Sequence, residues 1–545
     1  MDNWLTYYEP PRRSAKTLRR QEGMRQIFLV LALLMASALP AQEAPPLTFT
    51  VERFAVSGAM PVDAAAADEV LAPFTGEHAG MEGLLAARDA LEQHLRSAGY
   101  SFHRVVLPPQ TLDSGVVTLE VVTFDIGSVE VEGNQHFSAE SVRRSLPPLA
   151  AGSAPDLPRL SRALAVANQH PAKQLKLNFR ASEEREDALD AVVEVRDEKP
   201  WALFAGLNNI GNKSTGYTRM SVGGQYSNLT GHDDVLTGTF ITSPDNADDV
   251  QQYGVFYQLP VYAASGWLTA FYVKSDVDVG SVQDLFDVSG SGDFLGVSFR
   301  HDLVGVGRYR HSITAGIQDR LFDTAIASAI TGLPFATLST KVRTRPISLR
   351  YDGGYNWPAT SLDFYVDFTQ NLSFGGHNRP SSYRQVRAPA DPSWKLIRFG
   401  ALVTQRLPRE FRAVGRITGQ YTSEPLIPGE QIGFGGDRSV RGFEQRTIAG
   451  DRGVQLNVEL WSPPVAALYG VRFLTFFDAA HKVLDEPLTG QRPNDTISSI
   501  GIGARWQWRD DIVAALDYGQ PLANAEGEAA DRGNSKVHFT LEYRY

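Results

Sequence analysis

Residues 454–460 read Val-Gln-Leu-Asn-Val-Glu-Leu, a strict alternation of apolar and polar side chains. Because successive side chains of a β-strand point to opposite faces, this stretch predicts a strand with one apolar and one polar face. The same alternation recurs in residues 220–226, 362–368, 411–421 and 537–545. Between residues 200 and 545 we count about sixteen such segments of about ten residues each, the pattern of a transmembrane β-barrel of antiparallel strands.

A soluble β-sandwich or propeller is the alternative, because any half-buried strand alternates. The length of the segments favours the barrel, and so does a chain that ends within a strand, which suits a last strand closing against the first. We expect this closing strand to present Val537, Phe539, Leu541, Tyr543 and Tyr545 on one face. Aromatic residues also lie at predicted strand ends, where a girdle at the membrane interface would be: Trp201, Tyr257, Trp267, Trp461, Trp506 and Trp508.

One long segment interrupts the strands. Residues 433–453 read Gly-Phe-Gly-Gly-Asp-Arg-Ser-Val-Arg-Gly-Phe-Glu-Gln-Arg-Thr-Ile-Ala-Gly-Asp-Arg-Gly. They lie between the predicted strands 411–421 and 454–461, in a loop that we place at residues 422–453. Loops of this length are usually functional or disordered. Disorder does not fit, because the apolar residues Phe434, Val440 and Phe443 would need burial.

The loop contains the tetrad Val440, Arg441, Gly442 and Phe443. The strand that follows carries Phe476 and Asp478, and Asp478 alternates in phase with Arg472, on the polar face that we expect to line the lumen. The tetrad resembles the VRG[FY] motif of the outer-membrane assembly and two-partner secretion superfamily. This resemblance implies that the loop folds back into the barrel and that Arg441 pairs with Asp478 of an F-x-D motif on a neighbouring strand.

Residues 49–199 have a different pattern, which reads as β-α-α-β-β twice. Residues 51–56 are predicted as a strand, the leucines between 84 and 95 recur at helical spacing, and residues 102–107 and 116–122 are strands again. The second unit runs from a strand at 126–132 to one at 189–195. Each unit spans about 75 residues, which is short for an autonomous enzyme domain and typical of tandem interaction modules.

These units resemble polypeptide-transport-associated (POTRA) modules of haemolysin secretion/activation transporters, the first through residues 103–110 and 115–122 and the second through residues 129–134. Two POTRA modules, here 49–124 and 125–199, followed by a barrel, here 200–545, is the layout of two-partner secretion outer-membrane transporters (TpsB). We expect an edge strand of the first module to dock substrate by strand addition through its open backbone groups. Its residues are Phe102, Arg104, Val105, Val106 and Leu107.

The first 41 residues have the pattern of a secretory signal peptide, although Met24 could be the true start. An apolar run of fifteen residues follows Arg25 and ends in small residues, with cleavage expected after Ala38 or Ala41. About eight residues then separate Ala41 from Phe49, a reach of at most roughly 28 Å. This is too short for the pore-plugging helix that family members often carry. We therefore expect only the folded-back loop to obstruct the lumen.

Composition and motifs argue against catalysis. The 545 residues include no cysteine, which excludes disulfides, thiolate metal sites and thiol nucleophiles. Nucleophile-elbow, zinc-protease and nucleotide-binding motifs are missing, and the net charge of −10 argues against nucleic acid. We expect no enzyme activity, cofactor, metal or nucleotide, and we interpret the pair Asp233-Asp234 as a periplasmic turn rather than a metal site.

The resemblance implies a pore in the outer membrane of a Gram-negative bacterium, with its POTRA modules in the periplasm. It would recognise a large unfolded exoprotein of adhesin or haemolysin type and translocate it to the cell surface without ATP, as a monomer in outer-membrane lipid. Two alternatives stay open: a barrel-protein insertase or assembly factor on the same scaffold, and a passive solute porin.

Overall fold

The computed structural model describes residues 48–100, 102–185, 188–212, 215–248, 250–276, 280–282, 286–288, 290–327, 337–509, 511–523 and 534–545. The predicted signal peptide lies outside these residues. The described chain divides into two compact units, one ending at Thr123 and the other beginning at Phe124. No helix among the described residues is long and apolar enough to cross a membrane.

The first unit is a small α/β module. Its elements are β1 (Thr48–Val51), β2 (Arg53–Gly58), α1 (Ala64–Leu71), η1 (Ala72–Phe74), β3 (Gly76–Ala79), α2 (Glu82–Ser97), β4 (His103–Val106) and β5 (Val116–Thr123). The sheet has the order β2-β5-β4, with β2 parallel and β4 antiparallel to the central strand. Leu84, Leu91 and Leu95 of α2 are buried against it at the helical spacing seen in the sequence. The separate two-stranded sheet of β1 and β3 was not predicted, because four-residue strands are too short to show a period.

The second module belongs to the second unit. It contains β6 (Asp125–Glu132), α3 (Ala139–Arg144), α4 (Leu157–Ala167), β7 (Lys173–Ala181) and β8 (Ala188–Asp197), with the sheet order β6-β8-β7. Both helices begin at a side-chain cap: the oxygen of Ser138 accepts from Ser141 N–H, and the carboxylate of Asp156 accepts from Arg159 N–H. The predicted β-α-α-β-β order is correct here.

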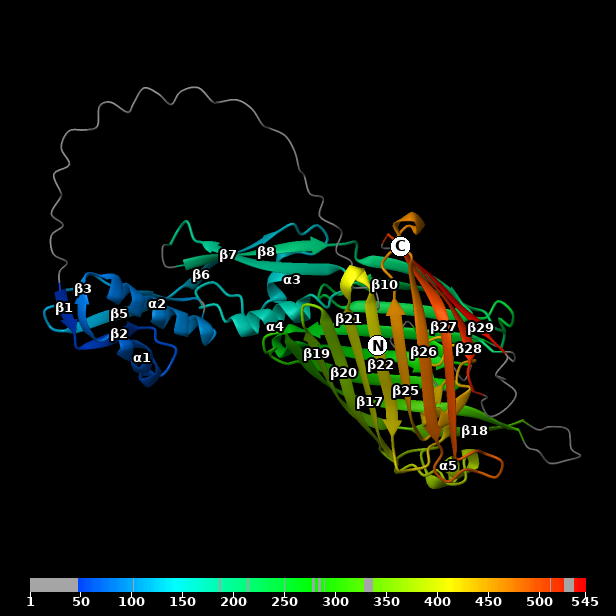
Figure 1. The fold of residues 1–545 in the computed structure, drawn as a ribbon. Coiled ribbons are helices and arrows are strands. Elements are labelled where there is room, and N and C mark those ends of the chain that lie inside the picture. The colour runs from blue at the N-terminus through cyan, green and yellow to red at the C-terminus, as the bar shows by residue number, and fades with distance from the viewer. Residues whose placement is uncertain are drawn as a thin grey trace, which may run out of the picture. The chain divides into compact units, whose positions relative to one another are not determined.

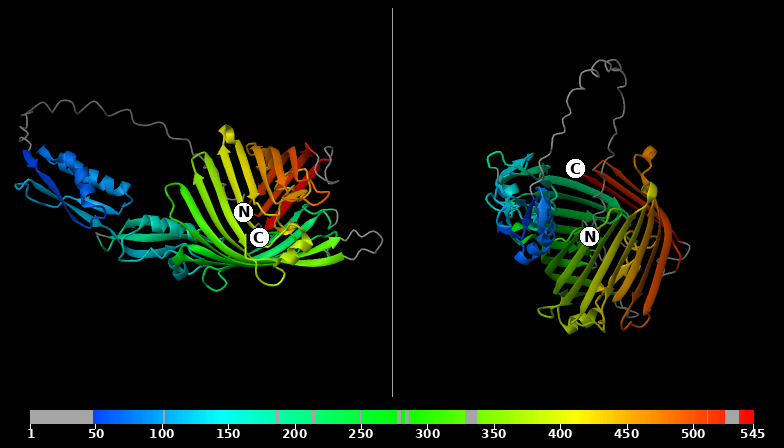
Figure 2. Two further views of the ribbon diagram at one scale, coloured as in Figure 1. Left: turned by 90° about the horizontal axis from the view of Figure 1, so that it is seen from below. Right: turned by 60° about the vertical axis from the view of Figure 1, so that its left-hand side comes forward.

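The rest of the second unit is a closed antiparallel barrel (Figures 1 and 2). Its described strands are β9 (Trp201–Asn208), β10 (Arg219–Ser227), β11 (Val235–Thr242), β12 (Gln251–Val261), β13 (Gly266–Ser275), β16 (Gly292–Asp302), β17 (Tyr309–Ala327), β18 (Thr337–Thr344), β19 (Pro346–Asn356), β20 (Thr360–Asn371), β21 (Lys395–Arg406), β22 (Arg412–Tyr421), β25 (Arg452–Trp461), β26 (Arg472–Val483), β27 (Asn494–Trp508), β28 (Ile512–Pro521) and β29 (Lys536–Arg544). β18 and β19 both pair with β17 as consecutive halves of one strand, so the described wall has 16 strands, which confirms the predicted fold.

The barrel closes between its first and last strands. The five pairs of this seam run from Thr540–Asn208 to Arg544–Phe204, and backbone bonds between Leu203 and Tyr545 extend it at one end. At the other end the amide side chain of Asn209 continues the ladder: it donates to the carbonyl of Val537 at 2.7 Å and accepts from Phe539 N–H at 2.9 Å. The exposed large apolar residues of the closing strand share its outer face: Val537, Leu541 and Tyr543.

The outer face is the apolar one, as the alternation predicted. Val454, Val458 and Leu460 of β25 are exposed, whereas Asn457 and Glu459 on the opposite face are buried within the lumen. Two residues of the predicted aromatic girdle do not belong to it. Trp267 is buried against the second module, where its indole N–H donates to the carbonyl of Val166 at 3.3 Å. Trp461 alternates with the outward Leu460, so its indole faces inward and donates to Glu459 at 2.7 Å.

Candidate functional site

The predicted long loop folds back into the barrel. It runs from the end of β22 to the start of β25 and contains η4 (Pro428–Glu430) and a small hairpin of β23 (Ile432–Phe434) and β24 (Ile448–Gly450). We call residues 422–451 the lumen loop. Its apolar residues form a buried cluster with two wall residues: Phe434, Val440, Phe443 and Ile448 pack against Ala480 of β26 and Ile497 of β27. The tetrad thus sits on a core of its own inside the lumen.

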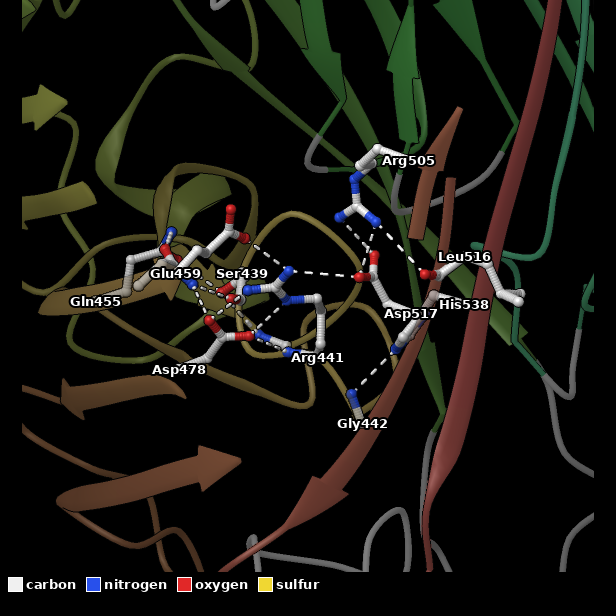
Figure 3. Close-up of polar contacts among 12 residues, drawn as sticks. Ser439, Arg441, Gly442, Gln455, Glu459, Asp478, Arg505, Leu516, Asp517 and His538 are labelled. Carbon is white, nitrogen blue, oxygen red and sulfur yellow. Dashed lines mark hydrogen bonds and ion pairs between the residues drawn. The ribbon is translucent and has the colours of Figure 1, made fainter. Parts of the chain in front are cut away.

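Arg441 of the tetrad is bound to Asp478 of β26 by three hydrogen bonds (Figure 3). Its Nε and Nη2 each donate to one carboxylate oxygen at 2.8 Å, and its backbone N–H donates at 3.1 Å. The guanidinium carbon lies 3.5 Å from the ring centre of Phe476, which adds a cation–π contact. The three residues named from the sequence are therefore brought together in the geometry that the resemblance implied.

Two further carboxylates surround the same guanidinium. Nη1 of Arg441 lies 2.7 Å from Glu459 of β25 and 3.6 Å from Asp517 of β28, which Arg505 also binds with two hydrogen bonds (Figure 3). Burial alone would lower the pKa of Arg441, but its hydrogen bonds and proximity to Asp478, with the charge of Glu459, raise it. The guanidinium is therefore permanently charged, and three carboxylates share two arginines within a buried network.

Steric constraints explain why position 442 of the tetrad is a glycine. Gly442 has φ of +94°, a left-handed conformation that residues with a side chain rarely adopt, and a Cβ atom there would lie 2.9 Å from the backbone of Gly519. A Cβ on Gly519 of β28 would in turn lie 2.5 Å from the nitrogen of Gly442. Beside this contact, Gly442 N–H donates to Nε2 of His538 at 3.1 Å. The loop therefore contacts the barrel wall backbone to backbone.

Sequence reasoning missed Glu459, Asp517, Gly519 and His538. The alternation does place each of these residues on the lumen-facing side of its strand. Their strands are far apart in the sequence, however, and only the pairing register of the closed barrel brings the residues together. Among the described residues no cluster of three or more His, Asp or Glu could hold a metal ion. A buried, permanently charged arginine with saturated carboxylate partners can fix a loop in place, but it offers no free acid, base or nucleophile.

The predicted docking strand is less open than the sequence suggested. β4 is the edge strand of the described sheet, where β5 is its neighbour. However, the N–H of Val105 already donates to a carboxylate oxygen of Glu92 at 3.2 Å, because α2 runs beside the strand. Glu92 also pairs with Arg96 one helical turn away. Addition of a substrate strand at Val105 would first have to displace this carboxylate.

A second buried polar site, also unpredicted, joins the second module to the barrel. Asp233 lies in the turn between β10 and β11, as the sequence predicts, but its side chain does more than form the turn. Its carboxylate is fully buried and lies 2.8 Å from Nζ of Lys173 of β7, which is buried as well. Ser141 of α3 and Tyr262 of the next turn also donate hydrogen bonds to Asp233.

His170 lies at the edge of this interface and predicts a pH dependence. Burial first, and then the charge of Lys173, lower the pKa of His170 to about 4, although Asp233 and Asp234 oppose the shift. When the module leaves the barrel, the pKa should return to its ordinary value of about 6.5. Because the docked state then binds fewer protons, docking should be strongest above about pH 6.5 and weaken by up to roughly 3 kcal/mol as pH falls towards 4.

Spin labels can check this, because the chain has no cysteine of its own. With labels at the exposed positions Lys176 and His232, the distance distribution should broaden as pH falls from 7.5 to 5. Phenylalanine cannot be protonated, so the His170→Phe variant should keep its narrow distribution. An equal broadening in both proteins would refute the assignment to His170.

Comparison with known proteins agrees with this architecture. The family described as "Haemolysin secretion/activation protein ShlB/FhaC/HecB" matches residues 189–506, and the family "POTRA domain, ShlB-type" matches residues 49–123. The chain is 23% identical to the outer membrane transporter CdiB-2 of Burkholderia pseudomallei over 82% of its own length and 79% of the relative. It is 21% identical to the heme/hemopexin transporter protein HuxB of Haemophilus influenzae, over 72% and 68%. Its fold is similar to that of CdiB from Escherichia coli, with a TM-score of 0.75 and 18% identity over 94% and 93% of the two chains.

Proposed function

Because this chain belongs to the haemolysin secretion/activation protein family of two-partner secretion transporters in the outer membrane, we propose that it translocates one large unfolded exoprotein through its barrel. In this proposal residues 49–124 and 125–199 are two periplasmic POTRA modules, and residues 200–545 form the pore. The pore acts as a monomer without ATP, cofactor or metal, and has no enzymatic activity. The exoprotein is of adhesin or haemolysin type and arrives unfolded from the periplasm.

The observation that carries the proposal is the lumen loop held by Arg441. A passive porin needs a permanently open channel, and a buried loop with its own apolar core would only obstruct it. A transporter for a polypeptide needs the opposite, a lumen that is closed at rest and polar once it opens. The lumen-facing side chains of the strands would make the open channel polar, because they include charged residues such as Arg398, Arg416 and Asp367.

Reconstitution tests this function directly. Proteoliposomes that contain only this chain should take up the unfolded exoprotein encoded beside its gene. The exoprotein should then become resistant to external protease without added nucleotide. A matched preparation with the barrel but no modules should not. If the exoprotein instead resists extraction from the bilayer as an integral barrel, the chain is an insertase, and the proposal is wrong.

A docking prediction follows from β4 and Glu92. Val105→Pro removes a backbone donor from the strand edge. It should therefore reduce the crosslinking between substrate and the first module to background level. Glu92→Ala frees the same N–H and should increase crosslinking. The two variants therefore move in opposite directions if the strand edge docks substrate. If both variants fold and crosslink as the parent does, docking lies elsewhere.

A further inference from the structure

A second segment besides the lumen loop occupies the barrel. The connection between β20 and β21, residues 372–394, contains α5 (Pro380–Val386), which Figure 1 places at the end of the barrel away from the second module. We call this segment the outer plug. Its residues Tyr383 and Trp394 are completely buried. The lumen loop is therefore not the sole connection with buried apolar residues within the described part of the barrel.

The outer plug is buried against the inner wall. Its apolar residues Tyr383, Ala390 and Trp394 share one cluster with Leu426 and Ile427 of the lumen loop and with residues from seven wall strands: Ile241, Phe256, Val273, Phe294, Phe322, Val342 and Leu396. These wall residues alternate with exposed ones such as Val255 and Leu295, which fixes their direction as inward. An apolar lumen face next to water would be unfavourable, so its apolar character requires a covering segment.

A buried salt bridge joins the outer plug to the lumen loop. Arg387, just after α5, binds the carboxylate of Asp451 at the end of the lumen loop with both terminal nitrogens, and both side chains are buried. The guanidinium also donates to the carbonyl of Leu426, at the beginning of the same loop, at 2.7 Å. Asp451 in turn accepts from the N–H groups of Leu426 and Asp485 at 2.9 and 2.8 Å.

The beginning of the lumen loop has an independent anchor. Glu430, also buried, accepts from Arg320 of β17 at 2.7 Å and from Thr344 of β18 at 2.8 Å. This anchor joins the loop to the wall and not to the outer plug. Arg387 is therefore the charged group that connects the plug, both ends of the lumen loop and the connection after β26 through Asp485.

We propose that residues 372–394 are a second plug of the resting pore, and that Arg387 is a positioning residue that couples this plug to the lumen loop, so that the two leave the lumen together. The inference extends the proposed function, since only passage of a polypeptide requires both segments to move. The plug itself can be tested without any substrate, which keeps its failure distinguishable from a failure of the proposed function.

Single-channel recordings of the purified full chain test the plug. The two ends of the segment are already joined, because Asn371 N–H donates to the carbonyl of Trp394 at 3.1 Å. Residues 373–392 can therefore be replaced by a short Gly-Ser turn without altering the wall ladder. The excised variant should give long-lived openings of larger conductance than the parent. A variant that folds, as shown by heat-modifiable migration, and conducts as the parent does would overturn the proposal.

A single substitution tests the coupling between the outer plug and the lumen loop. Arg387→Ala leaves Asp451 without its charged partner and should raise the open fraction by about tenfold or more, since breaking a buried pair ordinarily shifts an equilibrium by at least that factor. Arg384→Ala is the matched control, because Arg384 lies on the same helix but is exposed. Equal behaviour of the two variants would refute the role of Arg387.

A cysteine label follows the movement even if the alanine variant is unstable. Ala390 is 1% exposed, and the parent chain contains no cysteine, so Ala390→Cys provides a single small thiol in the plug. An external maleimide should not label it in the resting protein and should label it rapidly in the Arg387→Ala background and during secretion. Rapid labelling at rest would show that the plug does not occupy the lumen.

Discussion

Arg441→Ala should abolish secretion while the barrel remains folded in the outer membrane. Loss of the guanidinium leaves Asp478 and Glu459 buried without the charge that Arg441 supplies, which costs roughly 3–5 kcal/mol by comparison with other broken buried pairs. A loss of that size changes the equilibrium between the held and the released lumen loop by roughly two to four powers of ten. Exoprotein in the medium and heat-modifiable barrel in the membrane fraction are the two measurements.

Three further variants separate a specific role from general damage. Asp478→Asn should also lose secretion, since an amide cannot replace a carboxylate that accepts two guanidinium bonds. Exchanging the two residues should not restore it, because aspartate at position 441 would face Glu459 and Asp517. Arg300 is a lumen-side arginine whose side chain is 46% exposed, and its partner Asp302 keeps a hydrogen bond from Gln169, so Arg300→Ala should secrete normally. Normal secretion by Arg441→Ala at parental barrel levels would overturn the assigned role.

The features that could be predicted were those with a local pattern. Alternation along each strand identified the barrel and placed Asp478 on the lumen face, and the tetrad identified Arg441 as its partner. The missed residues depend on register between distant strands: Gly519 matters because its backbone touches Gly442, and no pattern near residue 519 reports that contact. In the same way, Trp267 looked like an interface aromatic until the fold placed a neighbouring module against it.

Asp233→Asn should release the second module from the barrel. Asparagine tolerates the left-handed backbone at this position, where φ is +61°, so the turn itself should survive. The change removes the only carboxylate that the described structure places against the buried ammonium of Lys173, and other buried pairs broken in this way lose roughly 3–5 kcal/mol. A broadened distance between spin labels at positions 176 and 232, with reduced secretion, is the expected result.

The control for this prediction lies on the same strand of the module. Arg180 forms an exposed pair with Glu130, so Glu130→Gln should change neither the distance distribution nor secretion. Burial is the difference between the two cations of this strand: water screens the guanidinium of Arg180, whereas Lys173 can keep its charge only while Asp233 faces it. If Asp233→Asn retained a narrow distribution, the apolar contacts of Trp267 and Val166 would suffice to dock the module, and the buried pair would not control its attachment.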